Sequence, residues 1–370
     1  MIIKRFEAEN FRNIEKCSLE FSDGINLLLG NNAQGKTNLA EGIYLFSRGK
    51  SFRGSDEGEL LKFGAEGFRL FIEYEDKRGK KTLEYAKFGK ERRRRFNGYK
   101  TEKLTEFIGN LRIVIFTPDD LTLVKGGPEE RRSFLNIAIS QYDKSYINLY
   151  YSYKKALENR NALLKLKQKG FYVDEKELIS WSEALAEYSS FIYIKREEYI
   201  KKLEVYTKQE LKKISSELED IEIKYKSDIE EKSEDRVFIK EKYNSLFKVN
   251  KEREILAGIT LFGPHRDEID IEINGMKARS FASQGQQRSI VLSMKLAEGE
   301  IIKKNIGEYP VYIFDDVLSE LDEGRQKFIL SEIKERQIII TSCSSKEAID
   351  FGENIIEVKG GEYKNVSSHR

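Results

Sequence analysis

Three stretches of the chain carry the residue types and spacing that phosphate and metal chemistry require. The first, 30–37, reads Gly-Asn-Asn-Ala-Gln-Gly-Lys-Thr and matches the pattern G-x-x-x-x-G-K-[S/T] at every fixed position. Its two glycines allow successive backbone N–H groups to converge on the β- and γ-phosphates of a nucleotide. Lys36 adds a positive charge, and the Thr37 hydroxyl is a ligand for Mg²⁺. The residues expected to bind nucleotide are Gly30, Asn31, Asn32, Ala33, Gln34, Gly35, Lys36, Thr37 and Asn38.

Two adjacent carboxylates form the second stretch. Asp315 and Asp316 follow an apolar run, 309–314, that is suited to a buried strand. A carboxylate at a strand end beside bound phosphates can hold Mg²⁺ directly or through water, and we assign that role to Asp315. We assign Asp316 to catalysis, because a carboxylate next to the metal can orient or deprotonate the attacking water. Lys36 is the second residue that we assign to catalysis. The competing interpretation is that the paired aspartates only cap a helix.

The third stretch, 283–288, reads Ser-Gln-Gly-Gln-Gln-Arg and precedes a helical run at 289–304. A hydroxyl, backbone N–H groups and the positive end of a helix together form a good receptor for a γ-phosphate. We therefore expect Ser283, Gly285 and Gln286 to bind nucleotide. On its own this stretch is weak evidence.

Apolar and alternating runs predict the elements that position these stretches. Four apolar runs are typical of strands buried on both faces of a parallel α/β sheet, and they lie at 25–29, 111–116, 309–314 and 336–342. Four alternating runs predict half-exposed antiparallel strands beside that sheet, and they lie at 3–9, 17–21, 68–74 and 83–88. The run at 269–275 also alternates, and we expect it to return the chain to the nucleotide sheet.

The character of the chain changes after residue 118. A helix is predicted to begin near Pro128, and the next ~130 residues are mostly helical in pattern. Between 178 and 206, apolar residues step by three, four or seven, which predicts one helix about 40 Å long at ~1.5 Å per residue. We interpret these stripes as the packing faces of an arm. The predicted domains are therefore a discontinuous head, 1–118 and 257–370, and a helical arm, 119–256.

Composition limits the other kinds of site and partner. The 370 residues are 39% hydrophobic and 35% charged, and no apolar run approaches the ~20 residues needed to cross a bilayer, so we expect a cytoplasmic protein without a membrane partner. A net charge of +2 means that DNA would have to meet a local basic patch. Four adjacent arginines at 92–95 are one candidate, and a solvated hairpin is the alternative. Cys17 and Cys343 lack metal-site spacing, and we expect both to be reduced and structural.

The three stretches together resemble the ATP-binding cassette signature in the variant of the SMC and RecF groups. Residues 319–322, Ser-Glu-Leu-Asp, follow the paired aspartates and add to that resemblance. Nearly the whole chain also resembles the RecF family of bacterial recombination mediator ATPases, including the spacing of its motifs. These motifs are Phe11-Arg12-Asn13, Thr117-Pro118-Asp119-Asp120-Leu121 with Lys125-Gly126-Gly127-Pro128 and Arg131-Arg132, Gly263-Pro264-His265-Arg266-Asp267, and Ser283 to Arg288.

The resemblance implies an α/β fold with an ABC-type P-loop ATPase head, built on a mixed sheet and an antiparallel β subdomain, and an inserted, mainly helical arm domain. It implies that Arg12 and Asn13 also bind nucleotide, that the cofactors are ATP and Mg²⁺, and that an ATP-dependent homodimer forms in which each phosphate-binding loop faces the other subunit's Ser283 stretch. It further implies a DNA-stimulated ATPase of DNA replication, recombination and repair, including the SOS response to DNA damage. Such a protein binds double-stranded and gapped DNA and helps RecO and RecR load RecA onto single-stranded DNA.

Two departures from the wider cassette pattern predict slow hydrolysis. Asp316 stands where many cassette ATPases have glutamate, and Thr341-Ser342 stands where transporters usually carry a switch histidine. His265 does not replace that histidine by position, and two roles stay open for it: a loop residue packed near the nucleotide, or ATP sensing. Two other functions also stay open. One is the ATPase subunit of a transporter, which the long arm disfavours, and the other is a nucleotide-binding scaffold without turnover, which would differ only at Asp316.

Overall fold

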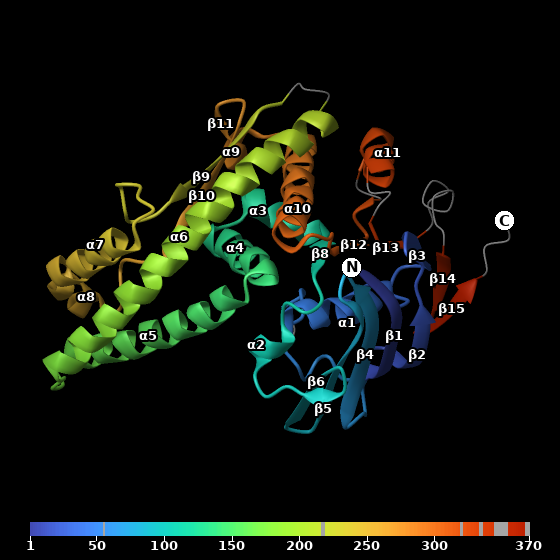
Figure 1. Cartoon of the computed structure of the whole chain (residues 1–370), viewed down its shortest axis with the longest axis horizontal. Helices are drawn as coiled ribbons and strands as arrows, with labels where there is room; N and C mark the ends of the chain where they lie inside the picture. The colour runs from blue at the N-terminus through green and yellow to red at the C-terminus, as the bar shows by residue number, and fades with distance from the viewer. Residues whose placement is uncertain (55, 216–218, 319–320, 333–335, 344–353, 367–370) are drawn as a thin grey trace. The chain divides into compact units, whose positions relative to one another are not determined.

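The computed structural model describes residues 1–54, 56–215, 219–318, 321–332, 336–343 and 354–366 (Figure 1). The chain divides into two units, the first formed by Met1–Leu121 and Val291–Arg370 and the second by Thr122–Ile290. Among the described residues, no helix is long and apolar enough to cross a membrane.

The buried apolar runs form a six-stranded sheet in the first unit, in the order β15-β14-β3-β13-β12-β8. The parallel strands are β8 (Ile113–Phe116), β12 (Val311–Asp315), β13 (Ile338–Ser342), β3 (Ile25–Leu29) and β14 (Asn354–Lys359), and β15 (Glu362–Val366) pairs antiparallel with β14. Every residue of β8, β12 and β13 is buried, as expected for parallel strands covered on both faces. The carboxyl ends of β3, β12 and β13 therefore meet at one edge of the sheet.

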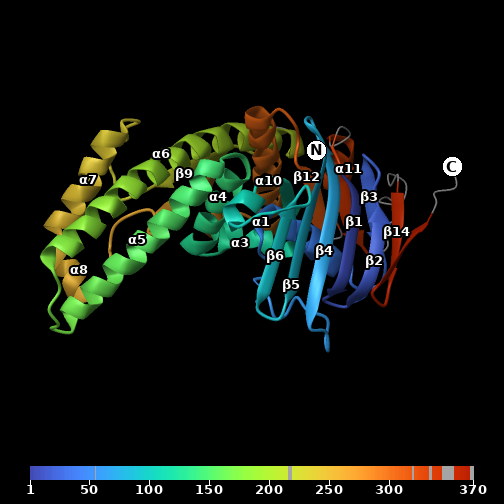
Figure 2. The same ribbon diagram turned by 60° about the horizontal axis from the view of Figure 1, so that its bottom comes forward.

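A second sheet of the first unit is antiparallel, in the order β2-β1-β4-β5-β6-β7, and Figure 2 shows β4, β1 and β2 side by side. Its strands are β1 (Ile2–Phe11), β2 (Ile14–Glu20), β4 (Gly67–Asp76), β5 (Gly79–Phe88), β6 (Glu91–Phe96) and β7 (Tyr99–Lys100). Alternate residues of β1 and β4 are buried, which matches the alternating sequence pattern. The strands β6 and β7 are joined by Asn97 and Gly98, which both have the positive φ angles that a tight hairpin turn requires.

The two sheets share one apolar core with α1 (Lys36–Arg48), the helix that follows the phosphate-binding loop. Phe6 and Phe11 of β1 and Leu28 of β3 belong to this core, together with Ile43 and Phe46 of α1. The remaining helical elements of this unit are α2 (Leu104–Phe107), a 3₁₀ turn at Pro118–Leu121 and α11 (Glu323–Glu332). Because α1 is buried between residues of both sheets, its first turn is held at a fixed place relative to the strand ends.

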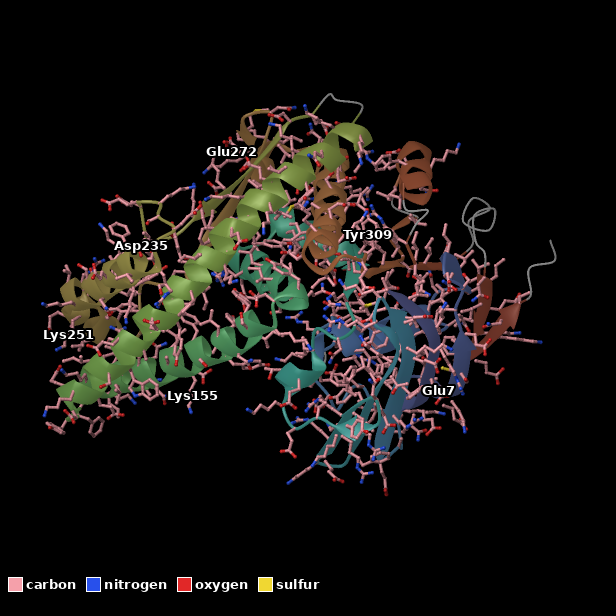
Figure 3. The ribbon with its side chains drawn as sticks, viewed as in Figure 1. Glu7, Lys155, Asp235, Lys251, Glu272 and Tyr309 are labelled. Carbon is pink, nitrogen blue, oxygen red and sulfur yellow. The ribbon has the colours of Figure 1, made fainter. Side chains whose placement is uncertain are left out.

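The second unit is mainly helical. Its helices are α3 (Thr122–Lys125), α4 (Pro128–Tyr142), α5 (Lys144–Gln168), α6 (Glu175–Ile214), α7 (Arg236–Val249), α8 (Lys251–Ala257) and α9 (Ala278–Phe281). The predicted stripe lies in α6, where Leu178, Leu185, Ile192 and Tyr199 are buried. Lys251 of α8, labelled in Figure 3, forms an ion pair with Glu175 in the first turn of α6. With 40 residues, α6 is longer than the helix predicted from the stripe and extends about 60 Å at ~1.5 Å per residue.

One strand prediction was wrong. The alternating run at 269–275 forms β10 (Glu268–Ile273), which does not return to the nucleotide sheet but lies in a separate three-stranded sheet between β9 (Ile221–Lys226) and β11 (Met276–Lys277). An alternating apolar pattern identifies a half-buried strand but does not identify the strand with which it pairs. Here the pairing strand is β9, in which buried and exposed residues also alternate. The segment 257–290 consequently belongs with the second unit, whereas we had placed it in the head. The helix α10 (Gln284–Ile306) passes from the second unit into the first.

Candidate functional site

The phosphate-binding loop connects β3 to α1, and its two fixed glycines are required by close approaches of neighbouring atoms. Gly35 has φ +114°, and a Cβ atom on it would lie 2.7 Å from both the Asn13 amide and the Tyr363 hydroxyl. A Cβ on Gly30 would lie 2.2 Å from the carbonyl oxygen of Val358. Side chains are therefore excluded at both positions, and the backbone of the loop is held against β14 and β15.

Lys36 folds back over its own loop. Its Nζ donates hydrogen bonds to the carbonyl oxygens of Gly30, at 2.8 Å, and Asn31, at 3.0 Å, and the residue is only 4% exposed. The Cys343 thiol at the end of β13 donates to Asn32 Oδ1 and lies 3.5 Å from Lys36 Nζ. Cys343 is exposed beside the loop rather than buried as Cys17 is, so the interpretation of both cysteines as structural holds only for Cys17.

The strand ends bring Thr37, Asp315 and Thr341 into contact. The Thr37 hydroxyl donates to Asp315 Oδ1 at 3.0 Å, and the Thr341 hydroxyl donates to the same oxygen at 2.9 Å. Burial is the main cause that raises the pKa of Asp315 to about 6, and the neighbouring Asp316 carboxylate raises it further, although the two hydroxyl donors oppose the shift. A buried carboxylate whose charge is disfavoured in this way is stabilised by a nearby cation.

The oxygen donors at this point fit Mg²⁺. Asp315 and Thr37 offer a carboxylate and a hydroxyl, and Mg²⁺ is usually held by one or two carboxylates together with substrate phosphates rather than by a cage of protein ligands. The described residues contain no group of three or more histidine, cysteine, aspartate or glutamate side chains that could hold a metal by themselves.

Asp316 directs its side chain to the site through an unusual backbone conformation. Its φ angle is +54°, in the left-handed region that aspartate tolerates better than most residues. Its N–H donates to the Thr341 hydroxyl at 2.9 Å, so Thr341 fixes both aspartates at once. The sequence identified Thr341 only as a departure from the transporter pattern, and its contact with the aspartates was missed.

A cavity of about 650 Å³ opens in front of the loop. Eight of the predicted site residues line it: Arg12, Asn13, Ala33, Gly35, Lys36, Thr37, Asn38 and Asp316. Four further residues of the lining were not predicted: Arg53, Glu59, Leu61 and Phe63. Of the other predicted residues, Asp315 reaches the site through Thr37, and Gln34 is turned toward the β14–β15 turn, where its carbonyl oxygen accepts from Gly361 N.

Arg12 and Asn13 form one wall of this cavity. The Arg12 guanidinium makes a bidentate pair with the fully buried Glu41 of α1, at 2.9 and 2.7 Å, and also donates to the carbonyl oxygen of Glu59 at 2.8 Å. The Asn13 amide donates to Gln34 O at 3.1 Å. Such a bidentate arrangement fixes the plane of the guanidinium. Sequence reasoning missed Glu41, although a carboxylate on the apolar face of α1 is the one available signal.

The helix α10 begins at Gln284, inside the Ser283 stretch and five residues before the run predicted at 289–304. Ser283 N donates to Gln286 Oε1 at 2.9 Å, and Gln286 N donates to Ser283 Oγ at 3.2 Å, which is a reciprocal N-terminal cap. Ser283 is exposed, and Gly285 and Gln286 are half-exposed. All three belong to the second unit, whereas the residues that line the cavity belong to the first.

Other residues singled out in the sequence are engaged elsewhere. Arg131 pairs with Glu268 at the start of β10, and Arg132 donates to the carbonyl oxygen of Asp267, the residue before that strand, so both arginines are engaged within the second unit. The ring nitrogens of His265 lie 2.6 Å from the Tyr153 hydroxyl and 3.1 Å from the carbonyl oxygen of Thr260. His265 is therefore packed into the second unit by both of its nitrogens. Ser319 and Glu320 of the predicted motif at 319–322 lie outside the described residues.

The arginines at 92–95 are held by neighbours on the antiparallel sheet. Arg92 pairs with Glu57, Arg93 with Glu91 and Arg95 with Glu84, while Arg94 lies over the Tyr85 ring. These contacts favour the interpretation of a solvated hairpin over that of a basic patch for DNA.

Comparisons with known proteins agree with this architecture. The family model described as the RecF/RecN/SMC N terminal domain matches residues 2–365. DNA replication and repair protein RecF of Clostridioides difficile (strain 630) is 38% identical over 369 residues, covering 100% of this chain and 98% of that protein. The corresponding protein of Clostridium kluyveri is 40% identical over 367 residues, covering 97% of this chain and 99% of that protein.

Solved structures give the same result. The recombination mediator protein RecF-ATP in the RecFOR pathway superposes with a TM-score of 0.93 at 36% identity, covering 99% of this chain and 98% of that chain. RecF-ATPrS of the same pathway gives a TM-score of 0.92 at the same identity. The predicted α/β head with a helical insert is confirmed, and the alternative of a transporter subunit is not favoured. The chain belongs to the RecF family of DNA replication and repair proteins.

Proposed function

We propose that the chain binds ATP with Mg²⁺ in the cavity of the first unit and hydrolyses it slowly to ADP and phosphate. The observation that carries this proposal is the convergence of Thr37 and Thr341 on Asp315 in front of the phosphate-binding loop. The Thr37 hydroxyl at the start of α1 and the Asp315 carboxylate at the end of β12 lie at hydrogen-bond distance, as two ligands of one cation require.

Each residue has a separate task in this proposal. The loop N–H groups and Lys36 bind the β- and γ-phosphates, and Thr37 and Asp315 would hold Mg²⁺, whose charge offsets that of the phosphate oxygens. Asp316 orients the attacking water and accepts its proton. Hydrolysis is slow because Asp316 is one methylene shorter than glutamate and its N–H is bonded to Thr341, which limits its reach.

We further propose that ATP joins two copies of the chain. A helix N-terminus such as that of α10 attracts a γ-phosphate. Ser283, Gly285 and Gln286 belong to the second unit, whereas the residues that line the cavity belong to the first. In the dimer, each loop is completed by the Ser283 stretch of the other subunit. The first unit then acts as the ATP-binding head and the second unit as the arm.

Mixing two inactive variants tests this arrangement. Lys36→Met removes the loop's charge and Ser283→Arg blocks the helix N-terminus, so each variant alone should neither dimerise with ATP nor hydrolyse it. A mixed dimer contains one site with an intact Lys36 from one chain and an intact Ser283 from the other. The mixture should therefore regain ATPase activity and an ATP-dependent dimer in analytical ultracentrifugation. An inactive mixture, with wild type dimerising normally, would contradict the shared site.

We also propose that the chain acts in the cytoplasm on double-stranded DNA at gaps, with RecO and RecR, to load RecA, and that DNA stimulates its ATPase. The support is the name and pathway of its relatives, which are DNA replication and repair proteins of the RecFOR pathway. Because the overall charge is only +2, binding depends on local phosphate contacts. Affinity for duplex DNA should fall on the order of 10³-fold between about 50 and 200 mM salt if six or more phosphates are contacted. Salt-independent binding would contradict the proposal.

A further inference from the structure

Phe63 is a fully exposed phenylalanine in the lining of the cavity that contains the phosphate-binding loop. Its exposed fraction is 103%, and it lines the same cavity as Lys36 and Thr37. Large aromatic side chains gain free energy when their faces are covered. A phenylalanine that protein atoms leave wholly uncovered, inside the lining of a ligand cavity, is therefore placed to be covered by the ligand.

The backbone on the N-terminal side of Phe63 is firmly anchored. Arg12 N donates to the carbonyl oxygen of Leu60 at 2.8 Å, and Lys62 N donates to that of Asn10 at 2.9 Å. Leu61 forms an isolated β-bridge with Phe11 at the end of β1. The ring of Phe63 thus projects from a segment that β1 holds in register, so that little backbone entropy is lost when a ligand covers it.

The cavity is larger and more varied in chemistry than phosphates alone require. Its volume of about 650 Å³ lies within the ~300–1,000 Å³ typical of sites for a whole small-molecule ligand. The loop lines it with a lysine and a threonine, whereas Leu61 and Phe63 line it with apolar side chains. A triphosphate has no apolar face, but the purine to which it is attached has two.

We propose that Phe63 is the platform on which the adenine base of ATP stacks, with Leu61 as its apolar neighbour. The inference rests on the proposed function, because it places the base of the nucleotide whose phosphates the loop binds. Phe63 then discriminates the whole nucleotide from free polyphosphate, while Lys36 and Thr37 bind the phosphates common to both.

Isothermal titration of the full-length chain with MgATP and with Mg-tripolyphosphate tests the platform. Phe63→Ala should weaken ATP binding about five- to 150-fold, the range to which base–aromatic stacking corresponds, and should change tripolyphosphate binding less than twofold. Phe63→Tyr should retain ATP affinity. Tyr99→Ala, which removes another exposed aromatic of the first unit outside the cavity lining, is the matched control and should change neither affinity.

A second readout reports the contact directly. The chain has a single tryptophan, Trp181, so Phe63→Trp in a Trp181→Phe background places the only indole at the platform. Its fluorescence should be quenched by ATP and not by tripolyphosphate.

Two results would overturn the inference alone: unchanged ATP affinity in Phe63→Ala, or equal losses for ATP and tripolyphosphate. Unchanged ATP affinity with weakened duplex DNA binding would assign the ring to nucleic acid instead and would likewise overturn it. If the wild-type chain bound neither ligand, the proposed function itself would fail, which distinguishes the two failures.

Discussion

Protonation of His265 should destabilise the second unit as the pH falls below 6.5. Burial is the main cause that lowers the pKa of His265 from 6.5 to about 4, and nearby arginines lower it further, although the hydrogen bond to the carbonyl oxygen of Thr260 opposes the shift. Because that oxygen can only accept, Nε2 carries the proton and Nδ1 accepts from the Tyr153 hydroxyl. A second proton on the ring would end this hydrogen bond in its present direction, because Nδ1 could no longer accept from the Tyr153 hydroxyl.

The size of this loss of stability follows from the pKa values of His265 in the unfolded and the folded chain. Between pH 6.5 and about 4 the unfolded chain binds a proton at His265 that the folded chain does not, so stability rises with pH in this window. The contribution of neutral His265 to the free energy of unfolding is complete above pH 6.5 and is lost progressively as the pH falls toward 4. At pH 5.0 the expected loss is about 2 kcal/mol relative to pH 7.5.

Urea unfolding of wild type and His265→Gln at pH 7.5 and 5.0 measures this loss. Trp181 lies in α6, so its fluorescence reports unfolding of the second unit. The drop in unfolding free energy between the two pH values should be about 2 kcal/mol larger in wild type, because glutamine has no group that titrates there. Equal drops would refute the reasoning. If His265→Gln remained stable at pH 7.5 but lost ATP binding, the ring would have a role in nucleotide sensing instead.

Three further substitutions test other parts of the molecule. Glu254→Gln leaves the Arg160 guanidinium, which is 1% exposed, without its charged partner and should destabilise the second unit by about 3–5 kcal/mol in urea unfolding. Arg12→Lys cannot make the bidentate pair with Glu41 and should lower the stability of the first unit by about 1.5–3 kcal/mol in thermal unfolding, with weaker ATP binding in titration calorimetry. Asp316→Asn should bind ATP normally but hydrolyse it about 10²–10⁴-fold more slowly, with or without duplex DNA, and unchanged hydrolysis would remove Asp316 from catalysis.

The parts of the site that the sequence predicts are those that lie within one short stretch. The loop at 30–37 and Asp315 each follow directly after an apolar run that predicts a buried strand. The parallel sheet then brings Thr37 and Asp315 together. Arg53, Glu59 and Phe63 were missed because the segment that carries them has no periodicity. Its place is fixed by pairing with β1, some fifty residues earlier in the chain, and such a long-range pairing leaves no local signal.

The same limit explains the errors in the fold. The heptad stripe predicted α6 but not its full length, because the apolar steps run only from 178 to 206, past the polar positions Lys195 and Lys202, whereas the helix spans Glu175–Ile214. Lys195 pairs with Asp143 and Lys202 with Glu198, so both stay at the helix surface. Likewise, the alternation of 269–275 predicted a strand, whereas its membership in the second unit depends on pairing with β9.

The hydrogen bonds of Lys36 and Ser283 suggest how a triphosphate can act as a switch with modest affinity. Lys36 donates to two carbonyl oxygens of its own loop, and Ser283 accepts from Gln286 N. A phosphate must replace the two bonds of Lys36, so its gain there is the difference between a neutral and an anionic acceptor, about 1–2 kcal/mol per bond. Ser283 accepts through its oxygen, so its hydroxyl proton can still be donated to a phosphate without breaking that bond. In the proposed dimer, a γ-phosphate that accepts from Ser283 of the other subunit would favour association about ten- to 150-fold, the factor to which a hydrogen bond of ~1.5–3 kcal/mol to a charged group corresponds. Loss of that phosphate on hydrolysis would weaken association by the same factor.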